Sequence, residues 1–302
     1  MHTVTVRDAR PGDAAAIAAV WSDAVPYLVR SDARAVADLA DDKVLRRRRL
    51  VGLLDGVLVG TGTARRVGPE EVFLTVEVLP EHGSRGVGTS LLRSLVADIP
   101  RPQDLTSVCR GDAISMAFAV RNGFLPAGEH QISRIDPADA ADPGDVPTGL
   151  EAVTLGSLVD LEPLLDAYNT AAGDDPSGLS RQFTREEFLA DWWNSPDNAP
   201  DHSWALVDQR DGGPVVASFT SVQVDPVRGR AWSAMTATHP SHRGKGLARW
   251  VKSRSLRALA DAAIGEAWTA NDATNVAMLA VNDALGYEAV TTSVRVQRRL
   301  SH

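Results

Sequence analysis

One short segment of the sequence combines glycines with basic residues where a predicted strand gives way to a predicted helix. It begins at Thr238 and runs through Arg243-Gly244-Lys245-Gly246. Such a loop directs backbone N–H groups and the positive end of a helix dipole at one point, which suits a phosphate or pyrophosphate. The two cations would add charge there. The segment predicts a diphosphate site, unless its glycines only shape a turn and its cations are solvated.

Two other phosphate motifs fit this segment poorly. A Walker loop needs Ser or Thr directly after Gly-Lys, but Gly246 follows Lys245. A dinucleotide fingerprint needs a third glycine where Arg249 stands. The sequence therefore disfavours ATP and NAD as ligands.

A related segment occurs in the first half of the chain, between Pro80 and Ser90. Aligned on Arg85 and Arg243, it has two extra residues after its proline and carries Val87 in place of a lysine. It is therefore less basic. Because most of such a cradle is backbone, we expect this copy to be able to bind the same group.

A carboxylate in the first half has the surroundings of a general base. Glu77 lies between Val76 and Val78 in a predicted strand, where burial would raise its pKa toward neutrality. Alternatively, it faces solvent or pairs with an arginine such as Arg65. The matching strand of the second half, 232–238, has no charged residue. A base there would act through water or come from the loop that links the first two helices, where Asp174 and Asp175 are candidates unless they are simply solvated.

The elements that position these residues follow the same order in both halves. The first half is predicted as a strand, two helices, a hairpin, a strand, the Gly-rich loop, a helix, a strand and a final helix: 3–8, 14–27, 32–39, 48–54 with 57–65, 72–79, 87–99, 106–109 and 112–122. The second half repeats this order between 151 and 285. A tandem duplication explains the repeat.

The chain length and one polar segment indicate two domains. With 302 residues, the chain is about twice the length of a typical domain. Residues 134–149 contain three prolines and four aspartates and little to bury. We predict an N-terminal domain over 1–138, a linker over 139–148 and a C-terminal domain over 149–302.

These patterns resemble the GNAT superfamily of N-acetyltransferases, in tandem. The acetyl-CoA signature of that family is Arg or Gln, two residues, Gly, one residue, then Gly or Ala. Residues 243–248 match it fully, and 85–90 match it except at Ser90. A later family helix carries Asn, then Tyr seven residues on and Gly-Phe eleven residues on. The second half has Asn275, Asn282 and Gly286-Tyr287 at these places, and the first half has Asp112, Ala119 and Gly123-Phe124.

The resemblance implies an α/β (α+β) fold of two tandem GNAT-like domains, each a mixed, mostly antiparallel sheet flanked by helices. It implies acetyl transfer from acetyl-CoA to an amine, with no metal. The implied cofactor-binding residues are Thr236, Ala237, Thr238, Arg243, Gly244, Lys245, Gly246, Leu247, Ala248 and Asn275, with Val78, Arg85, Gly86, Val87, Gly88 and Thr89 in the first copy. The candidate catalytic residues are Glu77 and Asn282; the latter stands at the family's Tyr and can hydrogen-bond a sulfur without being an acid.

Composition narrows the function classes. The formal net charge is −8, which argues against a nucleic-acid partner. One cysteine cannot form an internal disulfide, the first residues do not resemble a secretion signal, and no apolar run is long enough to span a membrane. His239 and His242 lack partners at metal-ligand spacing. We expect a cytoplasmic bacterial protein without a membrane partner; the sequence does not predict its oligomeric state.

The predicted function is acetyl-CoA-dependent N-acetylation of a primary amine on a small molecule or peptide, with acetyl-CoA bound by the second domain. An alternative is a catalytically degenerate protein that binds acyl-CoA as a sensor or interaction module, because both copies lack the family's Tyr. A third reading places catalysis in the first copy, with Glu77 as the base and the second domain structural.

Overall fold

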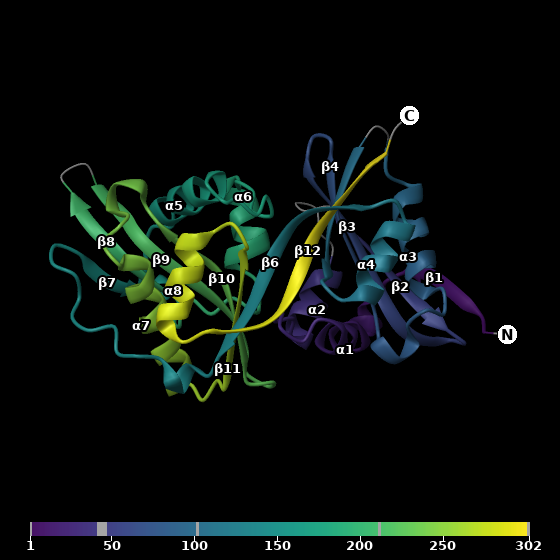
Figure 1. The fold of residues 1–302 in the computed structure, drawn as a ribbon, viewed down its shortest axis with the longest axis horizontal. Coiled ribbons are helices and arrows are strands. Elements are labelled where there is room, and N and C mark those ends of the chain that lie inside the picture. The colour runs from purple at the N-terminus through teal and green to yellow at the C-terminus, as the bar shows by residue number, and fades with distance from the viewer. Residues whose placement is uncertain (1, 41–46, 101–102, 211–212, 301–302) are drawn as a thin grey trace. The chain divides into compact units, whose positions relative to one another are not determined.

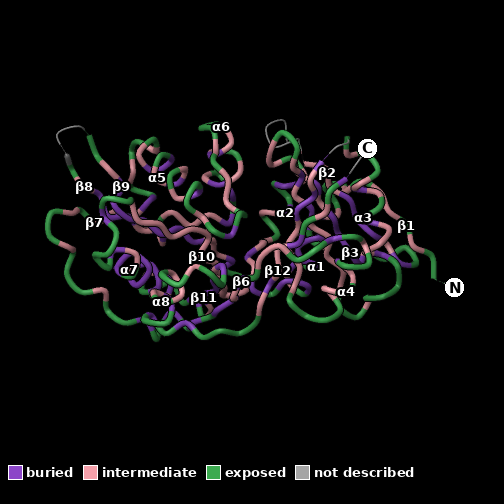
Figure 2. The backbone as a smooth tube through the Cα atoms, turned by 45° about the horizontal axis from the view of Figure 1, so that its top comes forward, coloured by how far each residue is buried: buried purple, intermediate pink, exposed green. Residues whose placement is uncertain are grey.

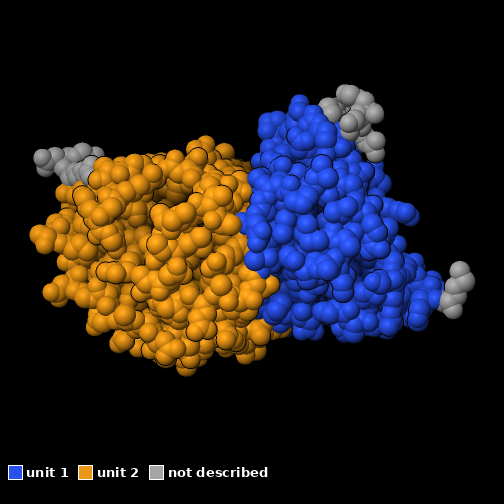
Figure 3. Space-filling model, in the orientation of Figure 1, with its two compact units in different colours: residues 1–129, 292–302 blue, residues 130–291 orange. Residues whose placement is uncertain are grey.

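A computed structural model describes residues 2–40, 47–100, 103–210 and 213–300. The chain divides into two compact units (Figures 1 and 3). Unit 1 consists of residues 1–129 and 292–302, and unit 2 of residues 130–291. Each unit is a sheet with helices packed on it.

Unit 1 has the strand order β1-β2-β3-β4-β5-β12. Its neighbours are antiparallel except for β4 and β5, which are parallel. The strands are β1 (Val4–Asp8), β2 (Arg48–Leu54), β3 (Val57–Gly68), β4 (Glu71–Val78), β5 (Gln103–Arg110) and β12 (Glu288–Leu300). The helices are α1 (Ala14–Ala24), α2 (Asp32–Leu39), α3 (Val87–Ala97) and α4 (Ala113–Arg121).

Unit 2 has the strand order β7-β8-β9-β10-β11-β6, and here β10 and β11 are the parallel pair. The strands are β6 (Leu125–Ile135), β7 (Glu151–Thr154), β8 (Trp204–Arg210), β9 (Gly213–Asp225), β10 (Arg230–Thr238) and β11 (Glu266–Asp272). The helices are α5 (Glu162–Gly173), α6 (Arg185–Glu187, continued as a π-helix to Trp193), α7 (Leu247–Asp261) and α8 (Val276–Leu285). The predicted mixed, mostly antiparallel sheets flanked by helices are confirmed.

The apolar residues of the strands alternate between two buried faces. In β8, Ala205 and Val207 pack with α5, whereas Leu206 between them packs with α7. This is the period of two that a strand covered on both faces requires. In unit 1 the larger cluster joins the sheet to α3 and the region after α4, and a smaller one joins α1 to α2. Burial is accordingly concentrated inside the elements (Figure 2).

The last strand of each sheet comes from the other half of the sequence. After α4 the chain enters β6, which pairs with β11 of unit 2, and after α8 it enters β12, which pairs with β5 of unit 1. The compact units therefore differ from the linear domains predicted above: residues 130–138 lie in unit 2 and residues 292–302 in unit 1.

Residues 139–148, predicted as a linker, lie within unit 2. They run alongside helix α7 and contact it. The Nε1 of Trp250 donates to the carbonyl oxygen of Asp145 at 3.0 Å, and the hydroxyl of Ser253 donates to the carbonyl oxygen of Ala141. Ala140 is buried in the core beside α7. The segment docks mainly through its backbone, so it needs few apolar side chains.

Candidate functional site

In both units the two parallel strands pair at their first residues and then separate. Residues 71–74 of β4 pair with 104–107 of β5, and residues 230–232 of β10 pair with 266–268 of β11. Beyond these positions the ladders stop. One backbone edge of β4 and of β10 is therefore unused by the sheet near Val78 and Thr238, and a ligand can hydrogen-bond to it.

The Gly-rich loops that follow β4 and β10 have the same backbone. Each starts with a 3-10 turn, at Pro80–His82 and at Pro240–His242. Each then has two left-handed residues with one residue between them, Ser84 and Gly86 in unit 1 and Gly244 and Gly246 in unit 2. The helix begins directly afterwards, and neither Gly86 nor Gly246 provides a side-chain cap. The first N–H groups of α3 and α7 are left for an anion.

This geometry corrects the alignment of the two loops. The sequence aligned Arg85 with Arg243, but the turns and left-handed residues align Arg85 with Lys245 and Gly83 with Arg243. The loops are therefore equal in length. The first copy lacks the arginine that begins the signature, and Gly88 lies opposite Ala248. Matching arginines was misleading because the backbone conformation, rather than the side chain, fixes the register.

The other predicted cofactor residues of unit 2 lie along this loop and strand. Thr236 and Thr238 are held by hydroxyls of β9, at 2.7 Å from Thr220 and 3.0 Å from Ser218. Arg243 forms an ion pair with Asp174 at 2.5 Å and donates to the carbonyl oxygen of Thr238. The remaining residues form the loop and the first turn of α7: Gly244, Lys245, Gly246, Leu247 and Ala248.

A buried histidine anchors the second loop to the sheet. The Nε2 of His242 lies 3.1 Å from the carboxylate of Asp208 on β8, and its Nδ1 lies 3.0 Å from the hydroxyl of Ser241. The hydroxyl of Ser241 also lies 2.9 Å from Nδ1 of His239. These contacts fix the turn that precedes the left-handed residues. Among the described residues, no group of three or more His, Cys, Asp or Glu side chains could hold a metal ion.

Glu77 lies on the separating part of β4, in a cluster that sequence reasoning did not find. Burial raises the pKa of Glu77 to about 7, against the opposing influence of Arg110 and Arg30. Burial also raises the pKa of the nearby Tyr27 to about 12, and the negative charge of Glu77 adds to this shift. Arg110 ends β5 and donates to the carbonyl oxygen of Ala24 at 3.2 Å. Tyr27, Glu77 and Arg110 lie close together because α1 packs on β4 beside β5. No local pattern in the sequence predicts this contact.

The corresponding place in unit 2 is apolar. Counting back from the loops, Ala237 occupies the position of Glu77, and it packs with Met235 against the aromatic core beside α5. The acidic residues considered for this unit have other partners: Asp174 pairs with Arg243, and Asp175 accepts hydrogen bonds from Ser177.

The last helices of the two units are capped alike. Asp112 accepts hydrogen bonds from two backbone N–H groups of α4, and Asn275 accepts one from Met278 in α8. Asn282 is buried, and its Nδ2 donates to Oδ1 of Asn271 on β11 at 2.5 Å. Its own Oδ1 has no hydrogen-bond partner in the part of the chain that the structure describes. The matching residue of unit 1 is Ala119.

The family model described as "Acetyltransferase (GNAT) family" matches residues 17–124. This range contains the separating strands and Gly-rich loop of unit 1, and unit 2 repeats both. Residues 17–124 therefore match the GNAT family, and the chain as a whole has the fold of tandem GNAT proteins. Its GNAT fold occurs twice, as the repeated element order predicted.

Two curated relatives share 26% identity with this chain. One is a mycothiol acetyltransferase of Nocardiopsis dassonvillei, matched over 86% of this chain and 87% of the relative. Another is a mycothiol acetyltransferase of a Nocardioides species, matched over 75% and 80%. Both relatives are named as acetyltransferases, and both matches extend over the two units of this chain.

Two solved structures have a similar fold over nearly the whole GNAT chain. A GCN5-related N-acetyltransferase from Sphaerobacter thermophilus has a TM-score of 0.73 at 16% identity, covering 99% of this chain and 96% of that one. A tandem GNAT protein from the clavulanic acid biosynthesis pathway also has a TM-score of 0.73, at 21% identity, covering 98% of each. At these identities the likeness shows the fold. None of the described helices is long and apolar enough to cross a membrane.

Proposed function

We propose that the protein transfers an acetyl group from acetyl-CoA to a primary amine, and that unit 1 performs the reaction. The observation that carries this proposal is Glu77, a carboxyl group on the separating part of β4 whose pKa burial raises to about 7. A base with this pKa is half ionised near neutral pH and can accept a proton from an ammonium or from the attacking amine.

The residues of unit 1 suggest a role for each part of the site. The backbone edge near Val78 would bind the pantetheine and the thioester carbonyl, and Gly86, Val87, Gly88 and Thr89 would bind the pyrophosphate through backbone N–H groups, with Arg85 adding charge. The amine nitrogen forms a bond to the carbonyl carbon while Glu77 takes its proton. The C–S bond then breaks and coenzyme A leaves as a thiolate.

Unit 2 is proposed as a second acyl-CoA site. Its loop has the full signature, and the cofactor residues predicted there, including Asn275, surround the start of α7 or cap α8. It has Ala237 where unit 1 has Glu77. We therefore expect unit 2 to bind acyl-CoA but to lack a general base on this strand.

A second candidate function is binding of acyl-CoA without turnover. It rests on Ala119 and Asn282, which occupy the place of the family's thiolate-protonating Tyr. Asn282 is buried against Asn271 and offers no acidic proton. Transfer by unit 1 then depends on the thiolate leaving without an acid from this helix.

The test is release of coenzyme A thiol from acetyl-CoA in the presence of a panel of amines. Compounds related to mycothiol belong at the head of the panel because the relatives carry that name. Glu77→Gln is compared with Glu71→Gln, which removes a carboxylate from the paired end of the same strand. Loss of amine-dependent release in Glu77→Gln alone supports the proposal. Binding of acetyl-CoA without release for any amine supports the second candidate.

A further inference from the structure

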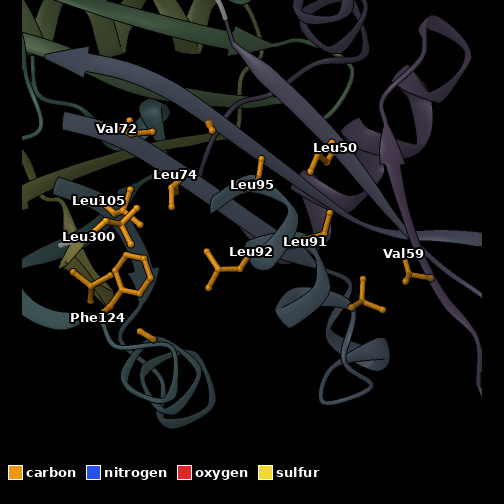
Figure 4. Packing of buried hydrophobic residues seen from close by; sticks show 14 of the residues in the cluster. Leu50, Val59, Val72, Leu74, Leu91, Leu92, Leu95, Leu105, Phe124 and Leu300 are labelled. Carbon is orange, nitrogen blue, oxygen red and sulfur yellow. The ribbon is translucent and has the colours of Figure 1, made fainter. Parts of the chain in front are cut away.

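The two units differ in the core behind their separating strands. In unit 1 this place is filled by apolar side chains that pack together (Figure 4): Leu74 of β4, Leu92 of α3, Leu105 of β5, and Phe124 after α4. All four belong to one buried cluster.

The equivalent residues of unit 2 are smaller or polar. Position in the paired ladder, in the helix and after the last helix gives Ser233 for Leu74, Lys252 for Leu92, Ala267 for Leu105 and Tyr287 for Phe124. These four side chains line a cavity of about 10 Å³, which is room for one water molecule. The fold accepts leucine at the place of Lys252, so the lysine is not a requirement of the architecture.

Lys252 carries a buried amine, and no acidic side chain among the described residues lines the cavity around it. Its side chain lies on the covered face of α7 with 2% of the residue exposed. The Nζ donates to the hydroxyl of Ser233 at 3.3 Å and lies 5.0 Å from the ring centre of Tyr287. The other lining residues are apolar or carry hydroxyls, and none is acidic. Burial lowers its pKa to about 7. Burying a protonated amine costs free energy of folding unless an anion pairs with it.

The cavity lies at the closed end of the separating strands. Ala231, Ser233 and Ala267 line it, and the last paired residues of β10 and β11 are Trp232 and Trp268. The register of the pairing between β10 and β9 shifts between Ser233 and Met235, next to the cavity. A pantetheine that entered between the strands from the Gly-rich loop would have its acyl group directed toward this end.

We propose that unit 2 takes an acyl-CoA whose short acyl chain ends in a carboxylate, such as malonyl or succinyl, and that Nζ of Lys252 and the hydroxyl of Ser233 bind that carboxylate. One carboxylate oxygen takes the place of the water that the cavity can hold. The inference rests on the proposed binding of acyl-CoA by unit 2. It does not require that unit 2 catalyse transfer.

The experiment is calorimetric titration of the full chain with succinyl-CoA and butyryl-CoA, which have acyl chains of equal length and differ in the terminal carboxylate. The Arg85→Glu variant is used alongside the wild type to weaken binding at the loop of unit 1. We expect succinyl-CoA to bind at least about tenfold more tightly than butyryl-CoA, as a charge-assisted hydrogen bond in a buried site provides. Equal affinities would overturn the proposal.

Lys252→Leu, which copies Leu92 of unit 1, is the decisive variant, and Lys252→Met is the second. Each is expected to reduce the preference to about one while leaving butyryl-CoA affinity within about threefold of the wild type. A preference that survives in a folded variant contradicts the role of Lys252. Free succinate is titrated in parallel. If Lys252 binds free succinate but contributes nothing to the binding of succinyl-CoA, the acyl-CoA assignment is contradicted. If no acyl-CoA binds at all, the proposed acyl-CoA binding fails together with this inference.

Discussion

Unit 1 and unit 2 share a backbone and differ in which end of the site carries an ionisable group. Unit 1 has Glu77 on the separating strand and a leucine-filled core behind it. Unit 2 has Ala237 and a buried amine, Lys252, in the matching places. The loops also differ, since only unit 2 begins its signature with an arginine. The difference shows that the strand separation and helix start belong to the fold, whereas acid–base chemistry and acyl recognition belong to single side chains.

The largest expected effect is at Glu77, which unit 1 has and unit 2 lacks. Glu77→Ala is expected to lower kcat/KM for amine acetylation by about 100- to 1000-fold, the usual contribution of a general base. Wild-type kcat/KM should rise with pH and level off above about 7, because protonated Glu77 cannot accept a proton. The measurement is initial rate against pH. A wild-type profile without this rise, or the same rise in Glu77→Ala, would assign the base to another group.

The second test is the stability of unit 2 in Lys252→Leu. The pKa of Lys252 falls from 10.5 to about 7 on folding. Between these values the unfolded chain binds more protons, so the wild-type free energy of unfolding rises with pH. We expect Lys252→Leu to stabilise unit 2 by on the order of 5 kcal/mol at pH 6 and by much less at pH 10.

Tryptophan fluorescence during urea unfolding measures this effect, because all tryptophans except Trp21 lie within the range of unit 2. Leu92→Ala in unit 1 is a useful contrast, since it removes packing without removing a charge and its effect should not depend on pH in this range. A pH-independent effect of Lys252→Leu would mean that the amine does not titrate near neutrality.

The third test compares the two loops at matched, exposed positions. Lys245→Glu and Arg85→Glu place a negative charge beside the uncapped starts of α7 and α3. Each should weaken acetyl-CoA binding by its own unit about tenfold. Charge reversal is preferred to a glycine substitution, because Gly246 and Gly86 have positive φ and a side chain would strain the loop. Calorimetry that finds two sites in the wild type and unchanged sites in both variants would place the pyrophosphate elsewhere.

The smallest expected effect concerns a feature that both units share, the side-chain cap of the last helix. Asp112→Ala and Asn275→Ala each remove a side-chain cap from α4 or α8. Each should cost about 1 kcal/mol of stability, the usual value of a helix N-cap. Urea unfolding of the two variants is the measurement. A much larger loss for Asn275→Ala alone would indicate that its side chain has a further structural role in unit 2.

Several features of the site could be predicted from the sequence. The hairpin at Asp55-Gly56 joins β2 and β3 as expected, and the Gly-rich loops lead into helices. Asp112 and Asn275 stand at helix starts. The apolar neighbours of Glu77 suggested desolvation but also left exposure or an arginine partner open, and in the structure the residue is half-buried. The register between the two loops did not follow, because it depends on left-handed backbone at Ser84, a residue type that gives no sign of it.

The sequence by itself determined the local features: where helices and turns begin, which loops can hold an anion, and that the element order occurs twice. These depend on residues a few positions apart. Only the tertiary structure decided that β12 completes the sheet of unit 1 and β6 that of unit 2, and that Arg110 and Tyr27 lie near Glu77. It also decided that Lys252 is buried in a cavity whose described lining residues include no carboxylate. The physical reason is that sheet edges and buried charges are settled by long-range packing, and residues distant in the chain carry no local signal of meeting.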